Sequence, residues 1–236
     1  MLQDKNIRAV IFDWGGTVVD QGSRAPVEAF VELFASDGVT VSEQEAVKPM
    51  GLAKRDHLAV MLESPAVVEA WRTAHGRDPH ADDIDRLYAR FPEIQIEAIR
   101  RRHDLIPGVL DLCAQLRARE IRIGTTTGFA QQMMAVLTPL AAGLGFEPDC
   151  IVCGDEVSQG RPAPWMLFEA ARRLDVYPPE SIVNVDDTVH GVRAGRNAGM
   201  WSIGVFASGA TDAETLQAAG AHQVIPSVAD LPGPLW

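Results

Sequence analysis

Carboxylates follow directly on two of the hydrophobic strands that this sequence predicts. Asp13 comes after the apolar run at 9–12, and the strand predicted at 182–186 ends in Asp186, which Asp187 follows. A charge at the end of a buried strand is costly unless a partner or a metal ion compensates it. These positions are therefore candidates for chemistry. The alternative for each is structural, with Asp13 capping a turn and the Asp186-Asp187 pair capping a helix.

Hydrogen-bond donors suited to an anion occur at other strand and loop positions. Thr127 and Gly128 follow a short strand, and Arg161 lies in a Gly-Arg-Pro loop. An Arg guanidinium presents a fixed fork of donors, and hard carboxylate ligands without His or Cys favour Mg²⁺. We therefore expect Asp13 to act as nucleophile and metal ligand, with Asp187 as a second metal ligand. A phosphoryl group would be bound by Thr127, Gly128 and Arg161.

A lysine on a predicted helix offers a different kind of chemistry. Lys54, His57 and Leu58 share one face of a helix that runs to about residue 62, because they are spaced at i, i+3 and i+4. A solvated basic face is the ordinary interpretation of such a pattern. The preceding Pro-Met-Gly-Leu is apolar, however, and its glycine lets the backbone approach a ligand, so Lys54 and Met50 are candidate site residues. His57 is either a proton shuttle beside Lys54 or a packing residue.

Strands and helices alternate in the second half of the sequence. Helical crossovers between strands give a parallel, doubly wound α/β sheet, and such sheets bind ligands at the carboxyl ends of their strands. Asp13, Thr127 and Asp187 all lie at such ends, so we expect them to meet in one active site. Strands are predicted at 122–125, 150–152, 182–186, 201–205 and 223–225, with helices at 109–119, 130–144, 164–174, 190–198 and 212–219.

The segment between the first strand and this α/β region carries only helical patterns. Helices are predicted from about 26 to 37, from 42 to 49, up to about 62, and at 66–75, 82–89 and 93–103. This order is typical of a cap domain inserted into an α/β core. We therefore predict a core formed by residues 1–20 and 101–236 and an all-helical cap at 21–100.

The composition is that of an ordinary soluble globular protein. Hydrophobic residues make up 47% of the 236 residues, and the net charge of −11 argues against nucleic acid or an anionic membrane as a partner. No apolar run is long enough to span a bilayer, and residues 1–5 lack the apolar region of a signal peptide. Cys150 and Cys153 flank two strand residues and should point to opposite faces. We expect buried thiols rather than a redox or metal motif, and a reducing, cytoplasmic location.

The segment 13–17, Asp-Trp-Gly-Gly-Thr, resembles the nucleophile motif Asp-x-x-Gly-Thr of the haloacid dehalogenase-like hydrolases. The resemblance implies that the first Asp attacks phosphorus and forms an aspartyl-phosphate. Three positions depart from the superfamily pattern. Gly15 stands where most of its phosphatases carry an Asp, Arg161 where a Lys is usual, and Gly191 where many members have another acidic residue. Asp186 is a candidate to compensate for Gly191 through a water molecule.

These departures, together with the lysine motif, resemble the phosphonoacetaldehyde hydrolases, or phosphonatases, over essentially the whole length. That family usually has Ala at the position of Gly15 and Tyr at the position of Phe129. The shared sequences are Asp-Trp-small-Gly-Thr at 13–17, Pro-Met-Gly-Leu-x-Lys-x-Asp-His at 49–57, Thr-Thr-Gly at 126–128, Gly-Arg-Pro-x-Pro-Trp-Met at 160–166 and Asn-Ala-Gly-Met-Trp at 197–201.

The resemblance implies hydrolysis of a P–C bond to acetaldehyde and phosphate. An unstabilised carbanion is a very poor leaving group, so Lys54 would form a Schiff base with the aldehyde and accept the electrons as an enamine. Mg²⁺ would be held by Asp13, Asp187 and the carbonyl of Gly15. Met50 and His57 would contact the substrate or Lys54, the cap would close over the core, and cap helices would form a homodimer interface.

Two other functions stay open on the sequence. One is an ordinary Mg²⁺-dependent phosphate-ester phosphatase of the same superfamily. Gly15 argues against it, because an ester oxygen usually needs a proton donor at that position. The other is a non-catalytic binding protein on the same fold, against which stands the intact set of Asp13, Thr127, Arg161 and Asp187.

Overall fold

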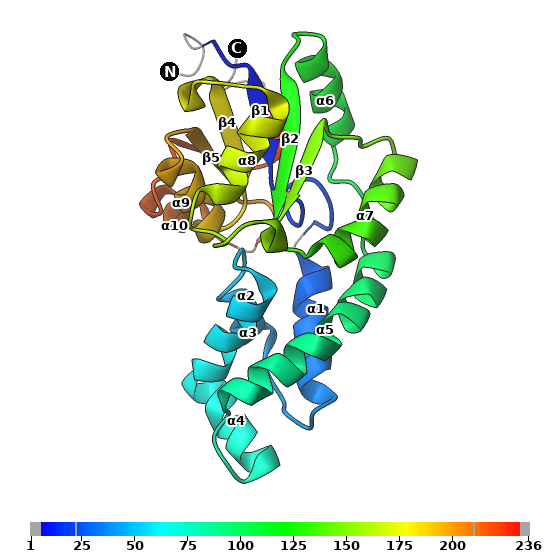
Figure 1. Cartoon of the computed structure of the whole chain (residues 1–236), viewed down its shortest axis with the longest axis vertical. Coiled ribbons are helices and arrows are strands. Elements are labelled where there is room, and N and C mark those ends of the chain that lie inside the picture. The colour runs from blue at the N-terminus through cyan, green and yellow to red at the C-terminus, as the bar shows by residue number, and fades with distance from the viewer. Residues whose placement is uncertain (1–5, 22, 210, 232–236) are drawn as a thin grey trace.

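One six-stranded parallel sheet forms the upper part of the molecule in the computed structural model, which describes residues 6–21, 23–209 and 211–231 (Figure 1). The strand order β3-β2-β1-β4-β5-β6 places β1 at the centre, hydrogen-bonded to β2 and β4. This confirms the predicted doubly wound sheet. The strands are β1 (Ala9–Phe12), β2 (Arg122–Thr127), β3 (Cys150–Cys153), β4 (Ile182–Asp186), β5 (Trp201–Val205) and β6 (Gln223–Ile225).

Strand β1 is buried along its whole length because helices cover both faces of the sheet. Alternate residues face opposite sides, so Phe12 packs into one core cluster and Ile11 into another. Helices α6 (Val109–Arg117) and α7 (Gln131–Gly143) contribute to the first cluster. The second contains residues of α8 (Trp165–Leu174) and α9 (Val189–Asn197), and α10 (Ala213–Ala218) packs on β5 and β6.

Five helices, which we call the helical unit, lie below the carboxyl ends of the strands in Figure 1. The chain enters this unit directly after β1 and leaves it before α6. Helix α5 is its spine, because both α1 and α3 pack along it. The helices are α1 (Arg24–Ala35), α2 (Glu43–Val47), α3 (Lys54–Glu63), α4 (Pro65–His75) and α5 (Ala81–Arg101).

Helix α5 corrects one prediction. The sequence predicts two helices, at 82–89 and 93–103, whereas the structure has a single helix that contains Pro92. A proline inside a helix removes one backbone hydrogen bond and usually kinks or breaks it. Here Leu87, Phe91 and Ile99 form a continuous buried face on either side of Pro92. Packing of that face against the helical unit outweighs the local cost.

The two cysteines of β3 point to opposite faces of the sheet, as predicted. Cys153 belongs to the cluster that contains Phe12, whereas Cys150 packs against the cluster on the other face. Neither forms a disulfide. Burial raises the pKa of Cys150 to about 11 and that of Cys153 to about 12, so both stay protonated thiols near neutral pH.

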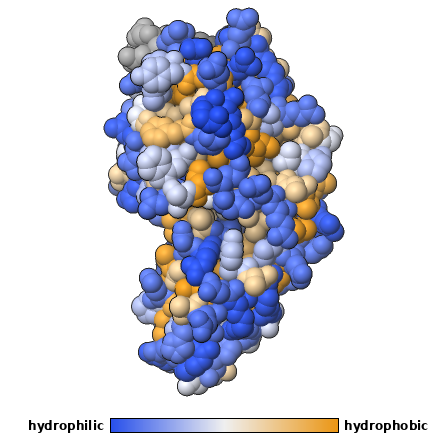
Figure 2. All heavy atoms as spheres, viewed as in Figure 1, coloured by the Kyte–Doolittle hydropathy of each residue, from blue (hydrophilic) through white to orange (hydrophobic). Residues whose placement is uncertain are grey.

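The surface seen in Figure 2 is mostly hydrophilic, and hydrophobic residues form small, separate areas over both the sheet-containing part and the helical unit. The outline narrows where the two parts meet. Within the described residues, no helix combines the length and apolar character needed to cross a membrane.

Candidate active site

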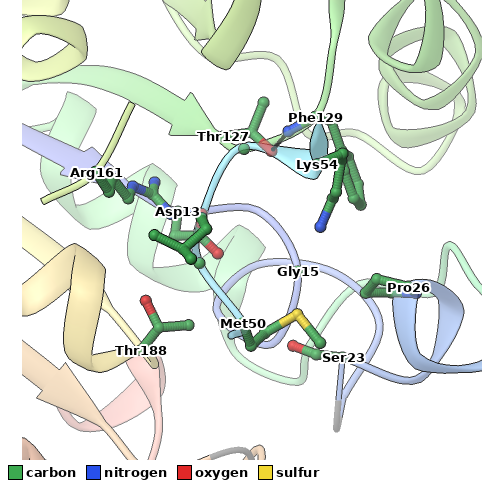
Figure 3. A pocket seen from close by; sticks show the side chains of 13 residues that line it. Asp13, Gly15, Ser23, Pro26, Met50, Lys54, Thr127, Phe129, Arg161 and Thr188 are labelled. Carbon is green, nitrogen blue, oxygen red and sulfur yellow. Dashed lines mark hydrogen bonds and ion pairs between the residues drawn. The ribbon is translucent and has the colours of Figure 1, made fainter. Parts of the chain in front are cut away.

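A small pocket lies where the carboxyl ends of the strands meet the helical unit (Figure 3). Asp13 at the end of β1 and Thr127 at the end of β2 line it from the sheet side. Met50 and Lys54 line it from the helical unit, and Arg161 reaches it from the loop before α8. Residues from four distant segments therefore share one site, and it lies at the strand ends, where the topology predicts ligand binding.

Arg161 is fixed against the sheet by several acceptors. Its Nη1 donates to Asp13 Oδ1 at 2.7 Å and lies 3.2 Å from Asp186 Oδ2. Its Nη2 donates to both the hydroxyl and the carbonyl oxygen of Thr126, at 2.8 and 3.0 Å. A guanidinium held in this way is a pre-organised charge beside the Asp13 carboxylate.

Asp13, Asp186 and Asp187 form a buried cluster in which one oxygen from each lies within 4.8 Å of the others. Asp186 Oδ2 and Asp187 Oδ1 are buried and have no hydrogen-bond partner among the described residues. Within the described part of the chain, Asp186 Oδ2 has only the ion pair with Arg161. Buried carboxylate oxygens without hydrogen bonds are costly, and hard oxygen donors are the ligands of divalent cations such as Mg²⁺ or Ca²⁺. The donor set therefore fits a divalent metal ion, and Asp186 belongs to it together with Asp13 and Asp187.

Burial dominates the acidity of these carboxylates. Desolvation raises the pKa of Asp13 to about 6 in spite of the lowering effect of Arg161, and the nearby Asp186 adds to the rise. Desolvation, followed by repulsion from Asp13 and Asp186, raises the pKa of Asp187 well above its ordinary value. A bound dication would offset these costs by supplying the positive charge that Arg161 alone does not.

Lys54, the first residue of α3, is buried at only 6% exposure. Its Nζ lies 5.0 Å from the centre of the Phe129 ring and 5.6 Å from that of Phe30. It makes no hydrogen bond or ion pair with a described residue, and Figure 3 shows it pointing into the pocket. Burial lowers its pKa to about 8, with Asp13 opposing and Arg161 adding to the shift. The interpretation of Lys54 as part of a solvated basic face is therefore wrong.

His57 lies behind Lys54, outside the residues that line the pocket. Its ring stacks on Phe30 with the ring centres 3.9 Å apart, and Nε2 is 2.9 Å from the carbonyl oxygen of Ala46. Burial and the neighbouring Lys54 lower its pKa well below the ordinary value. A neutral ring then donates from Nε2–H to Ala46 and leaves Nδ1 buried without a described partner.

The helical unit touches the core through backbone at two glycines. A Cβ atom at Gly128 would lie 2.8 Å from the carbonyl oxygen of Leu52, so only glycine allows this approach. Gly51 has φ +91°, and a Cβ there would lie 2.5 Å from Thr188 Oγ1. Thr127 Oγ1 accepts from the Phe129 N–H at 3.1 Å, which orders the turn that presents Gly128.

Comparison with known proteins places this site in a family. A model of the haloacid dehalogenase-like hydrolases matches residues 7–199. Phosphonoacetaldehyde hydrolase from Paraburkholderia phytofirmans is 43% identical over 96% of this chain and 93% of its own. The protein of that name from Bacillus cereus is 44% identical over 85% of this chain and 76% of its own. A solved structure, of a phosphonoacetaldehyde hydrolase-like protein from Oleispira antarctica, is 37% identical, with a TM-score of 0.94 over 98% of this chain and 92% of that one. The chain belongs to the phosphonoacetaldehyde hydrolase family.

Several residues of this phosphonoacetaldehyde hydrolase family member line the pocket without having been predicted. Ser23 donates from its hydroxyl to Asp187 Oδ2 at 3.3 Å, and Thr188 caps α9 by accepting from the Gly191 N–H at 3.0 Å. Thr188 directly follows the Asp pair and could have been found as an N-cap signal. Ser23 carries no signal of its own, because its place depends on how the chain turns between β1 and α1. Pro26, Gly51, Leu52 and Phe129 also line the pocket, together with Gly15 and Gly128, which the sequence analysis named as site residues.

Proposed function

We propose that this chain hydrolyses the P–C bond of phosphonoacetaldehyde, giving acetaldehyde and phosphate. The family relationship supports the reaction, because relatives named phosphonoacetaldehyde hydrolase match this chain over most of its length and most of theirs. The observation that carries the proposal is the presence of Asp13 and a buried Lys54 on opposite walls of one pocket. A carboxylate and an amine facing each other suit a substrate with a phosphoryl group at one end and an aldehyde at the other.

Lys54 supplies the covalent link to the aldehyde. A lysine with an ordinary pKa of 10.4 is neutral in about one molecule in 2,500 at pH 7. With its pKa lowered to about 8, about one Lys54 in ten is neutral at that pH, since burial disfavours the ammonium. The neutral amine adds to the aldehyde carbon and water leaves, which gives a protonated imine. The aromatic rings of Phe30 and Phe129 help to exclude bulk water from this amine.

Asp13 supplies the nucleophile for the P–C bond. One carboxylate oxygen attacks phosphorus, and the electron pair of the breaking P–C bond moves onto carbon and into the imine, forming an enamine on Lys54. The acyl phosphate on Asp13 is then cleaved by water to release phosphate. Protonation of the enamine carbon and hydrolysis of the resulting imine release acetaldehyde and the free amine. No acid at position 15 is needed, because the imine and not a proton activates the leaving group.

Arg161, Thr127 and the Gly128 N–H are the proposed phosphoryl contacts. Arg161 is already ordered by Asp13 and Thr126, so little entropy is lost when it binds the anion. Asp13, Asp187 and the Gly15 carbonyl would hold Mg²⁺, which neutralises charge between the carboxylate nucleophile and the phosphoryl group when bound. Met50 covers the pocket from the helical unit. We assign His57 a supporting role, because it stacks behind Phe30 rather than facing the pocket.

Release of both products from phosphonoacetaldehyde tests the proposal. The wild type with Mg²⁺ should release phosphate and acetaldehyde in equal amounts, whereas Lys54→Arg, which keeps the charge but cannot form the imine, should lose at least about 1,000-fold in kcat, because an unactivated carbanion leaves poorly. Borohydride reduction with substrate should attach a two-carbon adduct to Lys54, detectable by mass spectrometry. Hydrolysis of phosphate esters by both proteins, with no action on the phosphonate, would instead identify an ordinary phosphatase.

Three further properties are part of this proposal. Residues 21–100 would act as a cap that opens to admit substrate and closes onto the core formed by residues 1–20 and 101–236. The chain would form a homodimer through cap helices, which light scattering coupled to size-exclusion chromatography tests directly. The reaction would take place in the cytoplasm, which fractionation of the producing cells tests.

A further inference from the structure

Asp186 occupies the space where a side chain at position 191 would lie. A Cβ atom at Gly191 would be 1.8 and 2.1 Å from the two carboxylate oxygens of Asp186 and 1.9 Å from its carboxyl carbon. Atoms that are not bonded to each other cannot lie this close, so position 191 must be glycine as long as the Asp186 side chain keeps its place. The Asp186 carboxylate is thus seated on the first turn of α9, although it is attached to the end of β4.

The two oxygens of Asp186 have different surroundings. Oδ1 accepts from the Thr188 N–H at 2.9 Å and from its hydroxyl at 2.7 Å, which orders the loop between β4 and α9. Oδ2 lies 3.2 Å from Arg161 Nη1, belongs to the carboxylate cluster with Asp13 and Asp187, and has no hydrogen-bond partner among the described residues. The side chain is completely buried. The hydrogen bonds of Oδ1 are enough to order the loop. The buried Oδ2 beside Arg161 takes no part in them, so its place indicates a second role.

We propose that Asp186 is a positioning residue that holds Arg161 beside Asp13. Its carboxylate also supports the metal site formed with Asp13 and Asp187. It does so from the space that a side chain at position 191 would fill. The carboxylate is carried by the last residue of β4 and lies over a glycine on the first turn of α9. The effect on phosphoryl transfer rests on the proposed function, whereas the effect on metal affinity does not.

Loss of the Asp186 carboxylate would change the contacts of Arg161. Nη1 is shared between Asp13 and Asp186, and Nη2 is held by Thr126. Without Asp186, one side of Nη1 loses its anionic neighbour, and the guanidinium is free to pair more closely with Asp13. That pairing would withdraw the nucleophile from both the metal ion and the phosphorus atom. Loss of Asp186 should therefore lower kcat and metal affinity more than it raises KM.

Asp186→Asn tests the charge without changing the shape. The amide oxygen still accepts from Thr188, so the loop and the fold should be retained. Mg²⁺ affinity, measured by isothermal titration calorimetry on the substrate-free protein, should fall about 10- to 100-fold, as for other groups that support metal ligands. Asp83→Asn is the matched control, because Asp83 is also buried and paired with arginines but lies in the helical unit. It should leave Mg²⁺ affinity unchanged whatever it does to the melting temperature.

The same carboxylate can also be supplied from position 191. A carboxyl carbon attached to Cβ of residue 191 would start about 1.5 Å from it, close to the 1.9 Å that now separates that position from the Asp186 carboxyl carbon. The double variant Asp186→Gly/Gly191→Asp should therefore return the carboxylate to nearly the same place. Position 186 must become glycine rather than alanine, because its Cβ would clash with the new carboxylate.

The two single variants and the double variant together test whether a carboxylate in this place supports the metal site. Asp186→Gly should lose Mg²⁺ affinity and kcat, Gly191→Asp alone should unfold or lose both, and the double variant should recover to within about tenfold of the wild type. A folded double variant that binds Mg²⁺ no better than Asp186→Gly overturns the proposal. So does an Asp186→Asn protein with wild-type Mg²⁺ affinity. Inactivity of the wild type towards the phosphonate would refute the proposed function but leave the Mg²⁺ comparison decisive for Asp186.

Discussion

Lys54 lies between two aromatic rings with no described anionic partner in contact, and this setting should govern the pH dependence of the reaction. Only the neutral amine adds to an aldehyde, so kcat/KM should rise as the pH increases and level off above the Lys54 pKa of about 8. The Asp13 carboxyl, with its pKa of about 6, is mostly ionised above about pH 7, so the rise near pH 8 belongs to Lys54. Measurement of kcat/KM between pH 6 and 10 checks this, and a limb above pH 10 would contradict a desolvated lysine.

Two adjacent glycines in the loop after Asp13 should respond differently to substitution by alanine. Gly16 has φ +81°, and a Cβ there would lie 2.0 Å from Asp187 Oδ2, so Gly16→Ala should displace that carboxylate. The backbone strain alone costs about 1–2 kcal/mol. A Cβ at Gly15 would meet only Ser23 Oγ, at an ordinary 3.8 Å. We expect Gly16→Ala to lower both the melting temperature and Mg²⁺ affinity, and Gly15→Ala to match the wild type in both. Equal behaviour of the two variants would show that the Asp187 carboxylate does not depend on Gly16.

Some of the site residues could be predicted from the sequence, because their places follow from the order of the strands. Asp13, Thr127 and Asp187 could be predicted to meet, because strand order and the carboxyl-end rule place them before any side chain is packed. The Ser23 contact and the position of the Asp186 carboxylate over Gly191 could not, since both depend on distances of a few ångströms between segments far apart in the chain. Lys54 was recognised from its motif, but its burial is a property of the packed pocket.

Within the helical unit, one carboxylate joins the C-terminal ends of α1 and α4 to the first half of α5. Asp37, just after α1, accepts from Arg86 of α5 at 2.5 and 2.8 Å and from Arg90 at 3.1 Å, and it lies 3.2 Å from His75 Nε2 of α4. These hydrogen bonds lower the pKa of Asp37, the Arg86 bond first, while partial burial opposes the shift. The ionised carboxylate therefore stabilises the fold at neutral pH, and this contribution is lost as the pH falls below the ordinary Asp value.

Asp37→Asn should destabilise the protein by about 1.5–3 kcal/mol, the usual contribution of a hydrogen bond to a charged group. Asp85 offers the control, because it pairs with Arg55 at 2.6 Å while its side chain is 63% exposed. Exposed pairs contribute about 0–1 kcal/mol, so Asp85→Asn should change the free energy of unfolding much less. Urea denaturation followed by circular dichroism distinguishes them. Equal losses for the two variants would mean that Asp37 does not join these helices.

Helices and strands were predicted with the right bounds where the spacing of hydrophobic residues agreed with the residues that end an element. Strands at 201–205 and 223–225 have the predicted bounds. The long helix α5 was predicted as two pieces because Pro92 is a strong local breaker. The contacts that keep it continuous come from α1 and α3, and they are invisible to a local pattern.

In the whole molecule, the helical unit is in direct contact with the sheet-containing part. The carbonyl oxygen of Leu52 approaches the Cα of Gly128, and Gly51 lies against Thr188, so the loop before α3 rests directly on the strand ends. This contact sets the position of Lys54, which begins α3 two residues after Leu52. In the proposed reaction the imine on Lys54 and the nucleophile Asp13 must face the same small substrate. The fit between the two parts is therefore a condition for catalysis, not only for stability.

Gly128→Ala should separate these two conditions. Its Cβ would lie 2.8 Å from the Leu52 carbonyl oxygen, so the helical unit could no longer seat fully on the core, although each part would keep its own packing. A misplacement of about 1 Å costs about 100-fold in rate, and we expect a loss of that size in kcat/KM with a melting temperature close to that of the wild type.

Gly154 is the control, because it follows the neighbouring strand β3 and its Cβ would meet Gly128 backbone only at 3.5 Å. Gly154→Ala should keep nearly full activity. If Gly128→Ala were also fully active, or if borohydride trapped the imine on Lys54 at the wild-type rate while phosphate release was unchanged, seating of Leu52 on Gly128 would not be what aligns Lys54 with Asp13.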